Sequence, residues 1–310
     1  MSLVSKNIQT PAEQPHTIAY IKLVLCALFW GATFVAGRAA MQTMPPLTVA
    51  AGRFIVASLL LLLIAYRAEG GLQKISRDQI WVTLALGITG IALYNVFFFG
   101  ALQRMPAGKT ALLVALSPIL VAVTVAVIMK EKLGPYRWGG IAMALIGTLT
   151  IVTRGDILNE TQSLLQSFGW GELFMMAAII SWVAYTVISR FALRGLTPIA
   201  ATTYATLWGT LILVLAALTE IDTLHAGMLT WQSFLTVFYL GSFGSAIAFI
   251  WYNEGVKKIG PARTVVFTNL VPVFGVLLSY LILDEPIYLS MIVGGAIVIA
   301  GVTLTNQAKK

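Results

Sequence analysis

Apolar residues gather in ten long runs along the chain, and short polar stretches separate the runs. A helix needs roughly 20 predominantly apolar residues to cross the hydrocarbon core of a bilayer, and most of these runs reach or approach that length. We therefore predict an all-α integral membrane protein with ten transmembrane helices. They are expected at residues 18–41, 47–66, 79–102, 107–129, 136–152, 169–193, 197–219, 231–255, 262–283 and 287–306.

Two polar segments divide the chain into units. Residues 1–17 contain Pro11 and Pro15, and we expect them to form a disordered cytoplasmic tail. Residues 153–168 are the longest polar stretch between two apolar runs and are expected to be an extracytoplasmic linker. The predicted domains are therefore a first five-helix unit at 18–152 and a second at 169–307.

Composition supports a membrane location and excludes other classes. Hydrophobic residues make up 58% of the chain and charged residues 10%, against about 25% charged in a typical soluble domain. The apolar surplus must face lipid, so the bilayer is the expected partner. The net charge of +8 would suggest nucleic acid binding in a soluble protein. Here the basic residues lie in short loops, and we predict no nucleic acid partner.

The distribution of Lys and Arg predicts the orientation, because basic residues concentrate in cytoplasmic loops. With the N-terminus inside, fifteen of the 20 Lys and Arg lie in the tail, the C-terminus or inside loops. Only Arg38, Arg104, Lys109 and Arg154 lie outside, and Arg53 lies within an apolar run. Both termini are therefore expected in the cytoplasm, for a protein of a bacterial inner membrane.

The two units repeat one another at a fixed spacing. A separation of 154 positions relates Thr110 to Thr264, Pro118 to Pro272, Glu131 to Glu285, Gly140 to Gly294 and Gly147 to Gly301. A separation of 152 relates Trp30 to Trp182, Arg38 to Arg190 and Pro46 to Pro198. Because each unit holds five helices, the second must insert upside down relative to the first. Inverted repeats of this kind are typical of secondary transporters, whose substrate site lies near the midplane between the repeats.

These residues also carry a family resemblance. The segment Leu28-Phe29-Trp30-Gly31-Ala32-Thr33-Phe34, followed by Arg38, resembles the opening of an EamA domain, and Pro118, Glu131, Trp138-Gly139-Gly140 and Gly147 continue the pattern. The second unit repeats it at Pro261-Ala262, Pro272, Asp284-Glu285-Pro286 and Gly294. The chain is thus similar to the ten-helix branch of the drug/metabolite transporter superfamily. By overall similarity and aromatic content it most resembles YddG-type exporters of aromatic and neutral amino acids.

The repeated residues have physical roles that can be predicted. Pro118 and Pro272 fall near the middle of their helices, where a proline frees a backbone carbonyl and bends the helix, so both are candidate hinges. Glu131 and Glu285 end the same two helices and are expected to cap the helix that follows. The glycines at 140, 147, 294, 295 and 301 would allow the predicted helices at 136–152 and 287–306 to approach closely.

Aromatic and polar residues inside the spans mark the candidate substrate cavity. Polar groups at that depth are costly unless they face the protein interior. Aromatic rings with a few Asn and Ser groups would suit a moderately apolar zwitterion. The candidate cavity residues are Trp30, Phe34, Tyr94, Asn95, Phe98, Phe99, Trp182, Tyr185, Tyr239, Ser242, Ser245, Trp251 and Asn269.

Arg53 is the clearest ionisable residue within a span. It lies about two turns into its helix and could either pair with a substrate carboxylate or extend to the outer surface. The spans hold no Asp or Glu at mid-depth, which argues against obligate exchange of a hydrophobic cation for protons. Only one basic residue could line the cavity, which argues against a nucleotide-sugar or organic-phosphate carrier.

The predicted function is therefore alternating-access export of aromatic and other neutral amino acids. A broader drug or metabolite carrier of the same superfamily is the alternative. An intramembrane enzyme would need catalytic groups at depth, yet His16 and His225 lie outside the spans. Cys26 has no partner cysteine and no metal-ligand spacing, so we predict no metal and no cofactor. Both a monomer and a homodimer are compatible with the sequence.

Overall fold

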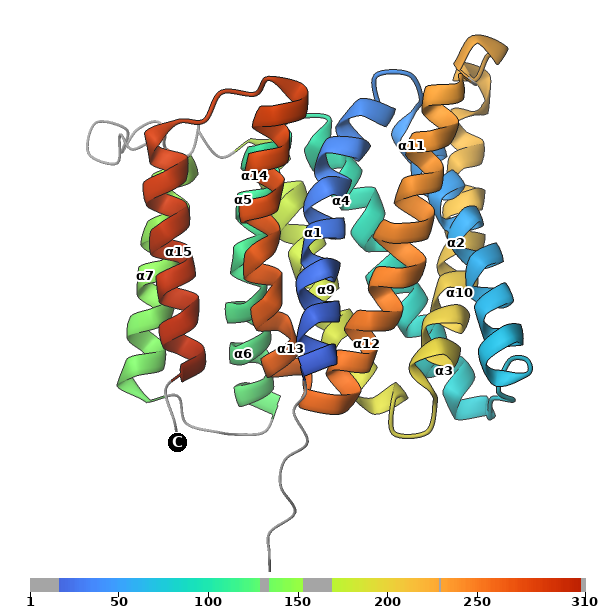
Figure 1. Ribbon diagram of the computed structural model, residues 1–310, viewed down its shortest axis with the longest axis horizontal. Coiled ribbons are helices and arrows are strands. Elements are labelled where there is room, and N and C mark those ends of the chain that lie inside the picture. The colour runs from blue at the N-terminus through green and yellow to red at the C-terminus, as the bar shows by residue number, and fades with distance from the viewer. Residues whose placement is uncertain (1–16, 129–133, 153–168, 229, 308–310) are drawn as a thin grey trace, which may run out of the picture.

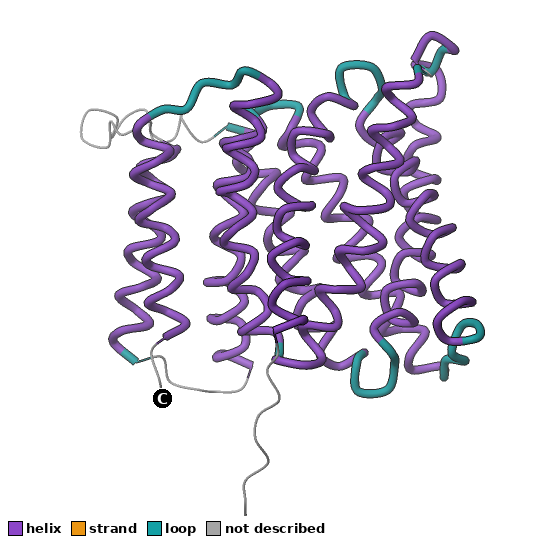
Figure 2. The backbone as a smooth tube through the Cα atoms, in the orientation of Figure 1, coloured by secondary structure: helices purple, strands orange, loops and turns teal. Residues whose placement is uncertain are grey.

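The computed structural model describes residues 17–128, 134–152, 169–228 and 230–307, and these ranges are helical with no strand. The expected tail and the expected linker at 153–168 lie outside the described residues, except for Thr17, which begins the first helix. Figure 2 shows the helices side by side, with the connecting loops gathered at the two ends of the bundle.

In the first half of the chain, irregular turns interrupt two of the long helices. The elements are α1 (Thr17–Ala40), α2 (Pro46–Glu69), α3 (Arg77–Leu86), the π-helical η1 (Gly87–Leu93), α4 (Tyr94–Leu102), α5 (Ala107–Leu113), the 3₁₀ turn η2 (Val114–Leu116), α6 (Ser117–Ile128) and α7 (Pro135–Val152).

The second half has a similar series of elements, with two additional 3₁₀ turns after its second helix. It contains α9 (Trp170–Ala192), α10 (Pro198–Ala217), the 3₁₀ turns η3 (Leu218–Thr223) and η4 (Ala226–Met228), α11 (Trp231–Gly241), the π-helical η5 (Ser242–Ile247), α12 (Ala248–Ile259), α13 (Pro261–Val266), the 3₁₀ turn η6 (Phe267–Asn269), α14 (Leu270–Leu283) and α15 (Leu289–Gln307). The helix predicted at 231–255 continues four residues further, to Ile259.

Local sequence explains where these helices begin and end. Proline occupies the first helical position of α2, α10 and α13, where its missing N–H is not needed. Ser76 caps α3 by accepting from the backbone N–H of Gln79, whose side chain accepts in return from the N–H of Ser76. Gly70 ends α2 with φ of 72°, a left-handed conformation that glycine adopts without strain.

In the part of the chain that the structure describes, seven helical segments are long and apolar enough to cross a membrane. They are Thr17–Ala40, Pro46–Glu69, Arg77–Leu102, Trp170–Ala192, Pro198–Thr223, Trp231–Ile259 and Arg263–Leu283. Three shorter apolar segments, Ile119–Ile128, Trp138–Gly147 and Leu289–Gly301, lie within the other predicted runs. That all ten runs cross the membrane stays a prediction.

The first helices of the two halves run in opposite directions. The last turn of α1, with Arg38, and the first turn of α9, with Trp170, line one pocket at the same end of the bundle. We call this end the α1-exit end; it is uppermost in Figure 1. The opposite end, where α1 begins and α15 ends, we call the α1-entry end.

The glycine-containing helices α7 and α15 pack together along one edge of the bundle (Figure 1). At Gly147 an added Cβ would lie 2.6 Å from the carbonyl oxygen of Gly294 and 2.8 Å from the backbone nitrogen of Val298. The predicted close approach of these two helices is therefore observed, and it depends on the absence of a side chain at Gly147.

Replacing Gly147 by Ala should therefore destabilise the protein, because the new methyl group meets backbone atoms that cannot move aside. We expect a loss of about 1–3 kcal/mol, seen as a melting temperature several degrees lower in detergent. Gly139→Ala in the same helix is the matched control, because an added Cβ there meets no atom within 4 Å. Equal melting temperatures for the two variants would contradict the proposed packing.

Candidate functional site

A small pocket lies inside the bundle, and both halves of the chain contribute to its wall. Its volume is about 40 Å³, which leaves room for little more than one water molecule. The lining residues are Trp30, Thr33 and Phe34 from α1, Arg53 from α2, Tyr94, Asn95 and Phe98 from α4, Trp182 from α9, Phe249 from α12, Thr268 from η6 and Val271 from α14. We call this the central pocket.

Arg53 is a buried cation at the wall of the central pocket. Its side chain does not extend to the outer surface, and the residue is only 4% exposed. Nε and Nη2 donate to Ser245 Oγ at 3.0 and 2.8 Å, and Nη1 donates to Asn95 Oδ1 at 3.3 Å. All these acceptors are neutral. None of the ion pairs among the described residues includes Arg53.

The two π-helical segments position the acceptors of Arg53. Asn95 directly follows η1 and is held by its own Nδ2, which donates to the carbonyl of Ile91 at 2.7 Å, so that Oδ1 faces the guanidinium. Ser245 lies within η5, where its Oγ donates to the carbonyl of Leu240 at 2.9 Å and its lone pairs face Arg53. π-helical turns are rare and occur often at functional sites.

Aromatic rings form the rest of the wall. Trp182 is the central ring, with centroids 5.1 Å from Trp30, 5.6 Å from Tyr94 and 5.6 Å from Phe249. Trp30 is anchored by its Nε1, which donates to the carbonyl of Gly244 in η5 at 3.1 Å. The pocket therefore combines one buried cation with several π faces.

Seven predicted cavity residues line the central pocket. Ser245 is not among the lining residues, but it accepts hydrogen bonds from Arg53. The seven are Trp30, Phe34, Arg53, Tyr94, Asn95, Phe98 and Trp182. Six other candidates are absent from its lining: Phe99, Tyr185, Tyr239, Ser242, Trp251 and Asn269.

These six have other surroundings in the bundle. Tyr185 packs on Gly90, and its hydroxyl accepts from Asn253 Nδ2 at 2.8 Å. Phe99 is fully buried against Phe98. The remaining contacts are Tyr239 Oη with the Phe29 carbonyl, Ser242 Oγ with the Phe238 carbonyl, and Trp251 with the ring of Phe29, while buried Asn269 leaves Oδ1 without a hydrogen bond among the described residues.

Four lining residues were not predicted: Thr33, Phe249, Thr268 and Val271. The sequence could have indicated Phe249 as a pocket residue, because it lies four positions after the candidate Ser245 and residues at that spacing share a helix face. Thr268 lies within the irregular turn η6 and Val271 two residues after it, where regular helical spacing does not predict which side chain faces inward.

The predicted hinge prolines follow 3₁₀ turns at corresponding positions of the two halves. Pro118 comes two residues after η2, and Pro272 three residues after η6. Each proline lacks the N–H that would bond the carbonyl four residues earlier, so the preceding turn can tighten into 3₁₀ geometry. The structure thus shows an irregular backbone at both sites, while hinge motion stays a prediction.

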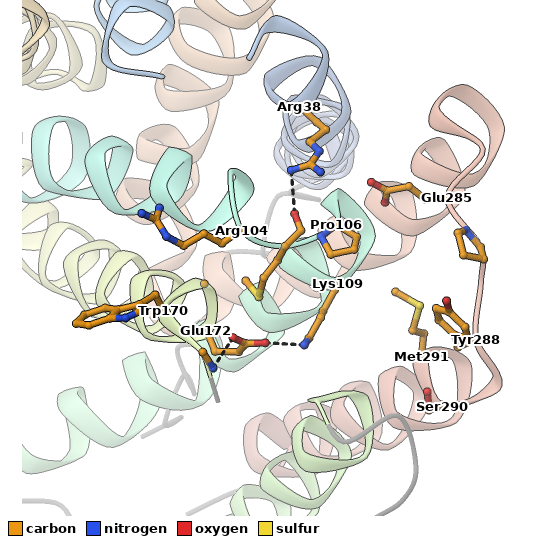
Figure 3. A pocket seen from close by; sticks show the side chains of 14 residues that line it. Arg38, Arg104, Pro106, Lys109, Trp170, Glu172, Glu285, Tyr288, Ser290 and Met291 are labelled. Atoms are coloured by element: carbon orange, nitrogen blue, oxygen red, sulfur yellow. Dashed lines mark hydrogen bonds and ion pairs between the residues drawn. The ribbon is translucent and has the colours of Figure 1, made fainter. Parts of the chain in front are cut away.

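A larger pocket of about 810 Å³ opens at the α1-exit end (Figure 3). Lys109 and Glu172 pair with each other, whereas Arg38 and Arg104 donate to backbone carbonyls and Glu285 accepts from backbone N–H groups. Lys109 Nζ lies 2.5 Å from Glu172 Oε1, and Glu172 Oε2 also accepts from the backbone N–H of Gly169. Glu172 lies in the first turn of α9 and is only 5% exposed. We take the central pocket as the candidate substrate site, because its cation Arg53 is buried and has only neutral hydrogen-bond partners. We call the larger pocket the vestibule.

The contacts of Glu285 contradict the prediction that it caps the helix that follows it. Its carboxylate accepts from the backbone N–H groups of Ala107 and Gly108 at 3.0 and 3.1 Å. It therefore caps α5, which belongs to the other half of the chain. Glu131 lies outside the described residues.

Comparison with known proteins agrees with this architecture. The sequence pattern of the EamA-like transporter family matches residues 17–153 and 169–307. The uncharacterized transporter YyaM of Bacillus subtilis is 30% identical over 287 residues, which is 93% of each chain. A probable terminal-alkyne amino-acid exporter of Streptantibioticus cattleyicolor is 28% identical over 285 residues, 92% of each chain.

A solved crystal structure shows the same fold. It has a TM-score of 0.67 and 23% sequence identity, and the alignment covers 93% of this chain and 97% of the other. The family match spans nearly the whole chain, and the helices have the length and apolar composition of membrane spans. The chain is a multi-pass membrane protein that belongs to the EamA-like transporter family.

Proposed function

We propose that this transporter exports small zwitterions, chiefly aromatic and other neutral amino acids, by alternating access through the central pocket. One observation carries the proposal. Arg53 is a buried cation whose hydrogen-bond partners in the described chain are all neutral. A buried charge without a counter-ion is costly. A substrate carboxylate would supply that counter-ion in a bidentate geometry suited to guanidinium.

The aromatic wall would hold the rest of the amino acid. Trp30, Tyr94 and Trp182 present π faces that can stack on an aromatic side chain or attract an ammonium group. The family relative named as a probable amino-acid exporter and the resemblance to YddG-type exporters support this substrate class. The volume of about 40 Å³ is too small for any amino acid, so loading requires the wall to open.

The topology that we propose is ten spans in two inverted repeats, with both termini cytoplasmic, in a bacterial inner membrane. The opposite directions of α1 and α9 support the inversion. The orientation is supported by the basic residues Arg190, Arg194, Lys257 and Arg263, which line a pocket at the α1-entry end. The vestibule at the other end would then face outward.

Counterflow into proteoliposomes tests the substrate class. Vesicles preloaded with unlabelled Phe, Thr or a nucleotide sugar should accumulate the matching labelled compound in the two amino-acid experiments and not in the nucleotide-sugar experiment. Absence of both Phe and Thr counterflow from correctly folded protein would overturn the proposal, and uptake of the nucleotide sugar alone would favour an organic-phosphate carrier.

Arg53→Gln should reduce Phe counterflow by about 100-fold, because the carboxylate then loses a charge-assisted bidentate contact of about 3 kcal/mol. Arg53→Lys, which keeps the charge but loses the planar fork, should retain an intermediate rate. Arg67→Gln is the control for loss of one exposed arginine. If Arg53→Gln remains folded and transports Phe at the wild-type rate, the carboxylate role is wrong.

Trp182→Ala should weaken Phe counterflow more than Thr counterflow, because Phe alone loses a stacking partner worth about 1 kcal/mol. Trp231→Ala is the matched control, since Trp231 is 70% exposed and does not line the central pocket. The measured quantity is the ratio of Phe to Thr rates. An unchanged ratio in Trp182→Ala would remove this side chain from substrate selection.

A further inference from the structure

A buried polar cluster borders the central pocket on its α1-entry side. It consists of Tyr185 in α9, Thr202 in α10 and Asn253 in α12, and we call it the amide cluster. Asn253 Nδ2 donates to Tyr185 Oη and to Thr202 Oγ1, both at 2.8 Å, and these two bonds use both amide hydrogens. Asn253 Oδ1 accepts no hydrogen bond among the described residues, although the residue is only 1% exposed.

An acceptor without a partner is unfavourable at this position. The segment Trp231–Ile259, which carries Asn253, has the length and apolar composition of a membrane span, where bulk water does not compete for hydrogen bonds. Buried polar atoms are normally paired, so an unpaired one is a place where a ligand can supply the missing bond. Arg53 lacks a counter-ion and Asn253 Oδ1 lacks a donor. One ligand with a carboxylate at one end and a donor at the other would satisfy both groups.

The register of α12 places the amide cluster one turn beyond the pocket wall. Phe249 lines the central pocket, and Asn253 follows it by four residues on the same helix face. Four residues advance an α-helix by about 6 Å. The separation between the centre of a phenol ring and an atom that accepts from its hydroxyl is also about 6 Å, since the O–H···O bond alone spans about 2.8 Å. The step from wall to acceptor therefore matches a para-hydroxylated ring.

The facing wall on α9 has the same arrangement. Tyr185 follows the pocket residue Trp182 by three residues, and their rings stack with centroids 5.0 Å apart. The Tyr185 ring also lies 5.7 Å from Phe249. The amide cluster thus borders the aromatic wall on both helices, with its hydrogen bonds to α9 and α10 fixing the amide of Asn253.

We propose that Asn253 is a specificity-determining residue that selects aromatic amino acids with a hydrogen-bond donor at the far end of the ring, chiefly tyrosine. The inference rests on the proposed function. Arg53 binds the carboxylate, Trp182 stacks on the ring once the wall has opened, and Asn253 Oδ1 accepts from the phenolic hydroxyl. Phenylalanine fits the same site but leaves Oδ1 unpaired. A site that hydrogen-bonds a substrate hydroxyl discriminates strongly against the analogue that lacks it.

Counterflow of labelled tyrosine and phenylalanine into proteoliposomes tests this selectivity. For the wild-type protein, kcat/KM for tyrosine should exceed that for phenylalanine by about tenfold, the effect of one additional hydrogen bond. Asn253→Leu has a similar volume but no acceptor, and it should bring the two values close together. A purely structural defect would lower both rates and leave their ratio unchanged. meta-Tyrosine, whose hydroxyl is displaced from the ring axis, should be transported by the wild type no better than phenylalanine.

Ser58→Ala is the matched control, because it removes a different contact between helices, the 2.9 Å hydrogen bond with Thr210 Oγ1, and Ser58 does not line the central pocket. It should keep the wild-type ratio. An unchanged ratio in Asn253→Leu would overturn the assignment. Equal wild-type transport of tyrosine and phenylalanine, or of tyrosine and meta-tyrosine, would also overturn it, and these comparisons need no variant to fold. Equal transport leaves the proposed export of aromatic amino acids intact, whereas absence of counterflow for both would overturn that function and this inference together.

Discussion

The burial of one guanidinium inside an apolar helix bundle is the constraint around which the central pocket is built. Arg53 cannot be left without partners at that depth, and the helices around it supply Ser245, Asn95 and the carbonyl of Gly244. These groups satisfy its donors but leave its charge uncompensated. The donors of the buried cation thus have partners, while its charge has no counter-ion among the described residues, as the proposed role in carboxylate binding requires.

Irregular backbone makes this arrangement possible. The π-helical segments η1 and η5 bring Asn95 and Ser245 to Arg53, and the 3₁₀ turns η2 and η6 precede the two prolines. Such turns weaken regular helical hydrogen bonding, which is tolerated only where protein or a cavity surrounds the backbone. In contrast, the packing of α7 against α15 is regular and close, and it joins the two halves at the edge of the bundle.

Contacts between the halves were harder to predict than the elements themselves. The apolar runs correspond closely to the observed helices, because length and hydrophobicity are local properties. Glu285, however, caps α5 rather than its own following helix, and Phe249 lines the pocket without having been predicted. Tyr239 and Trp251 were expected in the cavity and instead contact Phe29 of α1. Each of these differences depends on which helices become neighbours. The spacing of residues along a single sequence does not show which helices pack together.

By itself the sequence determined the membrane class, the positions of the helices, the repeat and the family, since these follow from hydrophobicity, residue spacing and motif. It also singled out Arg53 as a charge within a span. Only the tertiary structure showed that this arginine does not extend to the surface but is buried at the pocket wall. The physical reason is that a long basic side chain can extend to the surface or turn inward, and the acceptors that hold it inward come from helices distant in the sequence.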